Sequence, residues 1–185
     1  PESKIIVVDS LAASMGEGLT VYRAIQLKNE GKSIDETADY INAHRRNFVH
    51  FFTVDDLHHL YRGGRVSKTT AIVGSLAGIK PILHVNDAGQ LIPVGNVRGR
   101  KKSLTELFNV IHNLVKDKEA FEVIVLSGNA PEESTEIAEK FKAMPNCKYV
   151  LETSVSPVIG VHTGPGLLAL SVKCDSGMDN IKEDK

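Results

Sequence analysis

The stretch VIVLSGNAPEESTEIAEKF, residues 123–141, contains the features that decide the fold. It opens on residues 123–126, a continuous apolar run typical of a strand that is buried on both faces. Pro131 then stands just inside a helix start, followed by two glutamates where the helix dipole favours negative charge. Ile137 and Phe141 continue the apolar face of that helix. A buried strand, a turn and a helix in this order predict an α/β protein.

A similar order of elements occurs near the start of the chain. Residues 5–8, IIVV, predict another buried strand. Apolar residues at helical spacing over residues 18–30 predict a helix that stops at Gly31. Ser33 and Glu36 form a capping box, which predicts the start of a further helix. This echo favours two α/β units rather than one.

The polar run HRRN at residues 44–47 is the expected domain boundary. We expect residues 1–46 to be the C-terminal half of a first α/β domain and residues 47–172 to be a second α/β domain. Residues 173–185 are expected to form a polar tail. The chain opens on Pro1 rather than Met, and its first predicted strand has no strand before it. The first domain is therefore expected to be only partly present.

Strand and helix patterns alternate within the second predicted domain. The clearest helix is at residues 104–115, where the apolar residues fall on one face and Ser103 with Glu106 forms a capping box. The other expected elements are strands at 48–52, 149–151 and 167–172, a short helix around 57–60, an apolar stretch at 71–79, and a hairpin whose loop is at 87–89.

Composition excludes several classes of protein. Hydrophobic residues make up 42% of the 185, too many for a disordered chain. The net charge of −1 provides no general attraction to nucleic acid or to an anionic membrane. No apolar run is long enough to span a bilayer. Cys147 and Cys174 form neither a disulfide framework nor a metal-ligand pattern, and we expect a cytoplasmic protein without a metal.

The most unusual segment is GVHTGPG, residues 160–166. Three glycines around His162 and Thr163 leave little side-chain bulk and a permissive backbone, so a ligand would be able to approach the backbone with the histidine facing it. The alternative is a tight turn with an incidental surface histidine. The residues alone favour neither interpretation.

A second candidate site is the basic cluster VRGRKK at residues 97–102. Such a run is usually a solvated turn. The functional interpretation is a site for a phosphate, a carboxylate or an acidic protein surface, which the forked guanidinium of Arg98 suits. The run lacks interleaved aromatic residues, so we do not expect it to bind nucleic acid.

Taken together, these segments resemble the DegV family. The resemblance follows the family's order of motifs and covers the chain to about Val172. The motifs that carry it are VDS at 8–10 with Gly16, LxxLxxGGR at 57–65, GIKPI at 78–82, RGRKK at 98–102 and HTGPG at 162–166.

The resemblance implies two α/β domains that bury a long-chain fatty acid, such as palmitate, in a tunnel. It implies that His162, Arg98 and Ser10 lie near the carboxylate of the fatty acid or on the face that meets a partner. It further implies a bacterial protein that is not an enzyme and needs no cofactor. Such a protein presents the carboxylate to a fatty acid kinase, in lipid transport or fatty acid metabolism, with transient contact to membranes.

Simple energetics suit this role. Burying a tail of ~14 methylenes gains on the order of 11 kcal/mol before entropy costs, whereas the carboxylate needs hydrogen-bond donors or a positive partner. The alternative is an enzyme that acts on a small acyl or phosphorylated substrate, with His162 as its acid-base group and Arg98 as an anion clamp.

Overall fold

The computed structural model describes residues 3–67 and 78–174 and contains a six-stranded sheet in the order β3-β2-β1-β6-β4-β5. Strands β4 and β5 are parallel, and the other neighbouring pairs are antiparallel. The predicted mixture of helices and strands is therefore confirmed. The strands are β1 (Phe48–Thr53), β2 (Ile79–Val85), β3 (Leu91–Arg98), β4 (Phe121–Gly128), β5 (Cys147–Ser154) and β6 (Leu167–Lys173).

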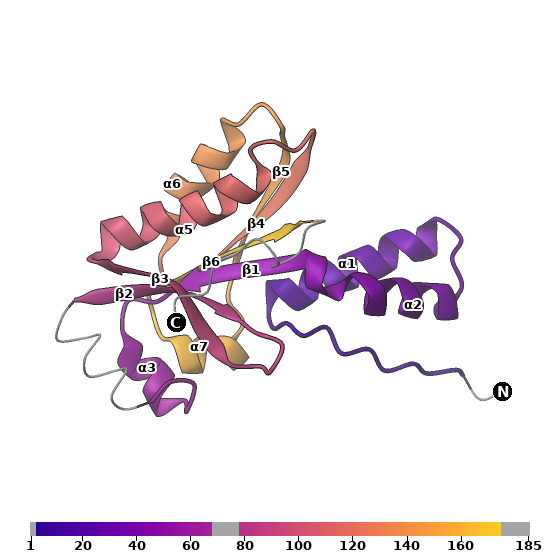
Figure 1. The fold of residues 1–185 in the computed structure, drawn as a ribbon, viewed down its shortest axis with the longest axis horizontal. Coiled ribbons are helices and arrows are strands. Elements are labelled where there is room, and N and C mark those ends of the chain that lie inside the picture. Colours follow the sequence, from indigo (N-terminus) through magenta and orange to yellow (C-terminus); the bar gives the residue numbers. More distant parts are fainter. Residues whose placement is uncertain (1–2, 68–77, 175–185) are drawn as a thin grey trace.

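Helices lie on both faces of the sheet (Figure 1). Helices α5 (Arg100–Val115) and α6 (Pro131–Lys142) cover one face. The other face carries α3 (Leu57–Arg62), α7 (Pro157–Thr163) and the start of the hairpin formed by α1 (Met15–Asn29) and α2 (Ile34–His44). A 3₁₀ turn, η1 (Arg45–Asn47), joins α2 to β1. Covering both faces explains why the central strands are apolar almost throughout.

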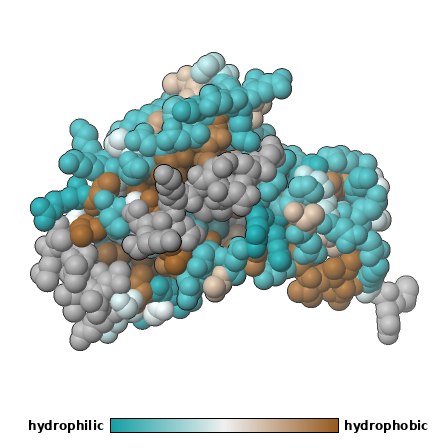
Figure 2. All heavy atoms as spheres, in the orientation of Figure 1, coloured by the Kyte–Doolittle hydropathy of each residue, from teal (hydrophilic) through white to brown (hydrophobic). Residues whose placement is uncertain are grey.

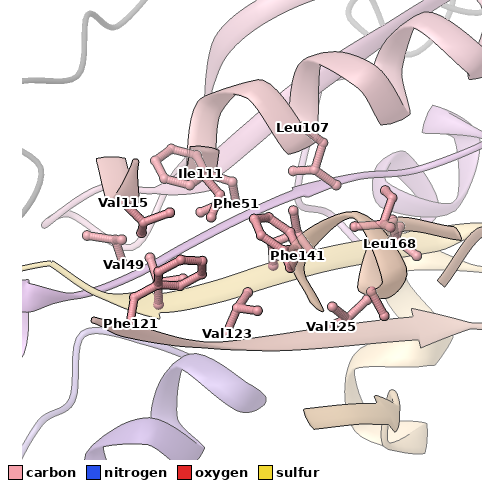
Figure 3. Close-up of a cluster of buried hydrophobic side chains, with 14 of the residues drawn as sticks. Val49, Phe51, Leu107, Ile111, Val115, Phe121, Val123, Val125, Phe141 and Leu168 are labelled. Atoms are coloured by element: carbon pink, nitrogen blue, oxygen red, sulfur yellow. The ribbon is translucent and has the colours of Figure 1, made fainter. Parts of the chain in front are cut away.

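The main core lies between the sheet and the α5–α6 layer (Figure 3). Phe141 of α6 packs between two aromatic rings, with its ring centroid 4.8 Å from that of Phe108 and 6.2 Å from that of Phe121. The predicted helix at residues 131–141 thus buries the apolar face that its spacing indicated. The other labelled core side chains are Val49, Phe51, Leu107, Ile111, Val115, Val123, Val125 and Leu168.

The α1–α2 hairpin attaches to the opposite face through a smaller apolar cluster. Leu19 and Leu27 of α1 and Ile41 of α2 are buried against Phe48 and Ile124 of the sheet. The predicted capping box of α2 is confirmed. The Glu36 carboxylate accepts a hydrogen bond from the Ser33 backbone N–H, and the Ser33 hydroxyl accepts one from the Glu36 N–H. The Ser33 backbone and the Lys32 ammonium lower the pKa of Glu36 to about 2.

The predicted strand at residues 5–8 is wrong. These residues are extended but pair with none of the strands, and Ile5 and Val7 are 85% and 91% exposed. An apolar run becomes a strand only where other strands satisfy its backbone groups, and no described strand lies beside this one. In Figure 2 the segment forms an apolar surface patch near the α1–α2 hairpin.

Two further expectations changed at the level of single elements. The predicted capping box at Ser103 is wrong, because α5 already begins at Arg100 and the Ser103 hydroxyl donates to the Arg100 carbonyl inside the helix. Gly99, which follows β3, has a φ of 87°, and this conformation allows the helix to start earlier.

The apolar stretch at 71–79 lies outside the described residues, apart from its last two positions. Strand β6 extends to Lys173, and the division into two domains stays a prediction.

Candidate ligand-binding cavity

A cavity of about 520 Å³ lies on the face of the sheet opposite α5 and α6. Its walls come from segments that are far apart in the sequence: residues 9–16 before and within α1, the β2–β3 hairpin at 85–91, and helices α3 and α7. Its floor is formed by side chains of β1, β4 and β6. The volume falls within the range of about 300–1,000 Å³ that is typical of small-molecule sites.

Apolar side chains form most of the cavity wall. They come from all the elements that surround it. A hydrocarbon chain placed against these side chains would be removed from water, which is energetically favourable. The apolar lining residues are Leu11, Ala12, Ala13, Met15, Phe52, Leu60, Val85, Ala88, Leu91, Leu126, Ile159, Leu167 and Ala169.

Polar side chains interrupt the apolar wall in three places. Arg65, His162 and Thr163 come from the α3–α7 side. His50 and Ser171 come from neighbouring positions on β1 and β6. The third group comes from the segments at 9–16 and 85–91 and contains Asp9, Ser14, Asn86 and Asp87. The cavity therefore has a cationic group on one side and two carboxylates on another.

Glycines bring α3 and α7 into close contact beside the cavity. A Cβ on Gly63 would lie 2.4 Å from Nδ1 of His162, and one on Gly164 would lie 2.4 Å from the ring of His59. A Cβ on Gly166 would lie 2.5 Å from that of Asp55. Side chains on one segment thus fill the space that the glycines leave on the other. This packing explains why glycines flank His162 in the sequence.

His162 lies where sequence analysis expected a binding residue. It is partly buried in the last turn of α7 and lines the cavity. The segment at 160–166 is not wholly a turn, however, because residues 160–163 complete α7 and only residues 164–166 form the turn. Pro157 at the helix start fixes a helical φ there, and the Gly164 N–H closes the helix on the Gly160 carbonyl.

Ser10 and Arg98 lie in different surroundings. Ser10 is half-buried, and its hydroxyl bonds the backbone of Ala12 at 3.2–3.3 Å, between two residues that line the cavity. Arg98 is the exposed last residue of β3 and is not among the lining residues. Nearby, Arg100 forms an ion pair with Glu133 of α6 that involves two guanidinium nitrogens. The structure thus brings the Ser10 segment and His162 to one cavity and leaves Arg98 outside it.

Sequence analysis missed two residues that line the cavity, Arg65 and His50. Arg65 belongs to the GGR motif and donates a hydrogen bond of 2.5 Å to the Gly63 carbonyl. His50 is the polar position in the strand FVHFFT. Its signal was a polar side chain within an apolar strand, but the sequence alone does not show that this side chain borders a cavity.

His50 is held in its neutral form. Burial lowers the pKa of its imidazole to about 4, and the neighbouring His84 lowers it further, while the Phe48 backbone acts in the opposite direction. Both ring nitrogens are buried, and neither makes a hydrogen bond of normal geometry to a described residue. The imidazole therefore supplies one donor and one acceptor rather than a positive charge.

Neither a metal site nor a membrane-spanning helix is found within residues 3–67 and 78–174. No group of three or more metal-binding side chains comes together there, and none of the helices described is long and apolar enough to cross a bilayer.

Comparisons with known proteins cover nearly the whole chain. A family model described as "Uncharacterised protein, DegV family" matches residues 1–174. A DegV domain-containing protein of Clostridium perfringens is 41% identical over 92% of this chain and 58% of its own length. One from Streptococcus pyogenes serotype M3 is 38% identical over 93% of this chain and 59% of its own. The chain thus spans a little under six-tenths of the length of these curated relatives.

Solved structures share the fold. A DegV family protein from Thermus thermophilus, described by its fatty acid binding, has a TM-score of 0.80 and 28% identity over 91% of this chain and 60% of its own. DegV from Bacillus subtilis, described as a fatty acid binding protein, has a TM-score of 0.76 and 29% identity over 90% of this chain and 59% of its own.

The close packing at Gly166 can be tested by comparing Gly166→Ala with Gly89→Ala. Both glycines have a positive φ, 82° and 74°, so both variants should lose about 1–2 kcal/mol from left-handed backbone strain. Gly89 has no neighbour within 4 Å of the added Cβ, whereas Gly166 meets Asp55. We expect Gly166→Ala to lose at least about 1 kcal/mol more in urea unfolding. Equal losses would show that Asp55 moves aside freely.

The buried His50 generates a second test, on the protein without ligand. The unfolded chain binds a proton at His50 more readily than the folded protein does. The contribution of His50 to the free energy of unfolding is therefore complete above about pH 6.5 and declines as the pH falls toward 4. The shift corresponds to about 3 kcal/mol. We expect the stability advantage of the wild type over His50→Gln to shrink by about that amount between about pH 7 and pH 4 in urea unfolding. A constant difference would contradict the burial of His50.

Proposed function

This chain belongs to the DegV family, and we propose that its cavity holds the hydrocarbon tail of a long-chain fatty acid such as palmitate. The observation that carries the proposal is the mostly apolar wall around a volume of about 520 Å³. The fatty acid binding described for the Thermus thermophilus and Bacillus subtilis proteins supports it. Each buried methylene gains about 0.8 kcal/mol, so the tail supplies most of the affinity.

The carboxylate is proposed to bind on the side of His162. Arg65 is the permanently charged cation among the lining residues, and it lies on that side with His162 and Thr163. Asp9 would repel a carboxylate at the segment that it occupies, whereas Asp87 is already paired with Arg46. Ser10 is proposed to hold the segment at 9–16 against the ligand through its hydrogen bond to Ala12, on a side of the cavity other than that of the carboxylate.

Arg98 is proposed to act on a partner rather than on the buried ligand. It is exposed and lies outside the cavity lining, and Lys101 and Lys102 are also exposed a short distance along the chain. Such a basic surface suits a partner that brings acidic groups, and we propose a fatty acid kinase that phosphorylates the presented carboxylate. In this proposal the chain itself carries out no covalent step. It works in the bacterial cytoplasm and contacts membranes only transiently.

The direct test is native mass spectrometry of the chain purified from bacteria. We expect a co-purified long-chain fatty acid, present at up to one per chain. Extraction with an organic solvent should remove the acid, and added palmitate should restore the bound mass. An empty cavity that rejects palmitate, together with turnover of acyl or phosphoryl esters that His162→Ala abolishes, would instead support the enzyme alternative.

A pair of substitutions separates the ligand anchor from the partner contact. His162→Ala should weaken palmitate binding by about 1–3 kcal/mol, because the buried carboxylate loses a donor. Arg98→Ala should leave palmitate binding nearly unchanged and slow phosphorylation by the kinase. Binding is measured by titration and phosphorylation by acyl phosphate formation. Equal losses in both assays for Arg98→Ala would make Arg98 an anchor of the ligand, and full binding by His162→Ala would remove the proposed role of His162.

A further inference from the structure

A second polar position lies inside the apolar cavity, away from the proposed headgroup site. His50 on β1 and Ser171 on β6 are direct partners across the two strands, and both line the cavity. Leu126, Phe52 and Ala169 line it on the same face of the sheet. On the floor of the cavity, a purely hydrocarbon ligand would meet apolar side chains except at this pair.

His50 is left with unused hydrogen-bonding capacity. The residue is partly exposed where it borders the cavity, yet both of its ring nitrogens are buried without a partner of normal geometry. Leaving a buried donor or acceptor unpaired is costly. A rotation of the ring by 180° about χ2 exchanges the positions of its nitrogens and its ring carbons. It would place a nitrogen where a carbon now lies.

The surroundings of His50 suit a neutral oxygen rather than a carboxylate. The low pKa of His50 keeps the imidazole uncharged at neutral pH, and His84 disfavours added positive charge there. Gly16 and Met15, which border the same part of the cavity, bring no charge. Arg45 and Arg46 border His50 from an adjoining cavity, where Arg45 donates to the Asp9 carbonyl and Arg46 pairs with Asp87. A hydroxyl or oxo oxygen accepts a hydrogen bond from a neutral imidazole without requiring a counter-charge.

We propose that His50 and Ser171 bind an oxygen substituent on the hydrocarbon chain of the ligand, so that this protein takes hydroxy or oxo fatty acids. The inference rests on the proposed function and specifies the ligand further. In this proposal the ring of His50 rotates to bond the oxygen, and the Ser171 hydroxyl provides a second hydrogen-bonding group beside it.

The position of the pair along the sheet determines which part of the ligand it meets. Helix α7 leads through residues 164–166 into β6 at Leu167, which also lines the cavity. Ser171 is four residues further along β6, or about 13 Å. An acid whose carboxylate is held at His162 therefore reaches His50 with the middle or far part of its chain, and the oxygen lies there rather than next to the carboxylate.

The test compares palmitate with C16 acids that carry one hydroxyl or one oxo group at different carbons. Affinities are measured by titration of the delipidated chain, of His50→Phe, and of His112→Phe as a matched control on α5, outside the cavity lining. For the wild type and the control, we expect one narrow range of positions to bind about tenfold more tightly than the other positional isomers. In His50→Phe this preference should disappear, so that all positional isomers bind with similar affinity.

NMR of the wild-type protein tests the same inference without relying on the folding of a variant. Binding of the preferred isomer should change the imidazole ¹⁵N resonances of His50 as a hydrogen bond forms, and binding of palmitate should not. Equal affinity for all positional isomers, or a preference that survives in His50→Phe, would overturn the inference while palmitate binding still supports the proposed function. Failure to bind any of the acids would overturn both.

Discussion

Both faces of the central strands have to be covered, and the rest of the structure depends on this constraint. Strands β1 and β6 carry large apolar residues on alternate faces, with Phe51 and Leu170 toward α5 and Phe48 and Phe52 toward the opposite side. Helices α5 and α6 pack one face into a continuous core. The opposite face is covered by separate pieces, and the space between these pieces is the cavity. The helices therefore leave this second layer incomplete, and a ligand bound as proposed would complete it.

Close backbone contact keeps the pieces of that second layer in place. The turn after α7 and the end of α3 approach each other so closely that glycine is required at Gly63, Gly164 and Gly166. The side chains that occupy the vacated space include His162, so the same contacts that join the two segments also orient a residue of the cavity. A substitution in the glycine motifs is consequently expected to change both the stability of the fold and the position of His162.

The sequence predicted elements whose determinants are local and missed those that depend on distant partners. The α6 start at Pro131 and the capping box of Ser33 lie within one turn of the residues that they organise, and both were predicted. The strand at residues 5–8 was wrong because strand hydrogen bonds come from other segments. For the same reason His50 was not recognised: its relation to Ser171 exists only through pairing of strands that are 121 residues apart.

The pairing of β1 with β6 also affects how the chain reaches its native state. These two strands lie side by side at the centre of the sheet, but along residues 3–67 and 78–174 they are the first and last strands. Contacts between segments so far apart slow folding, because a long loop has to close before they form. During synthesis β1, the β2–β3 hairpin and the β4–α6–β5 unit all emerge before β6, and β1 and β4 are not joined through β6 until it has left the ribosome. The cavity floor, which needs β1, β4 and β6 together, is therefore among the last parts of the molecule to form.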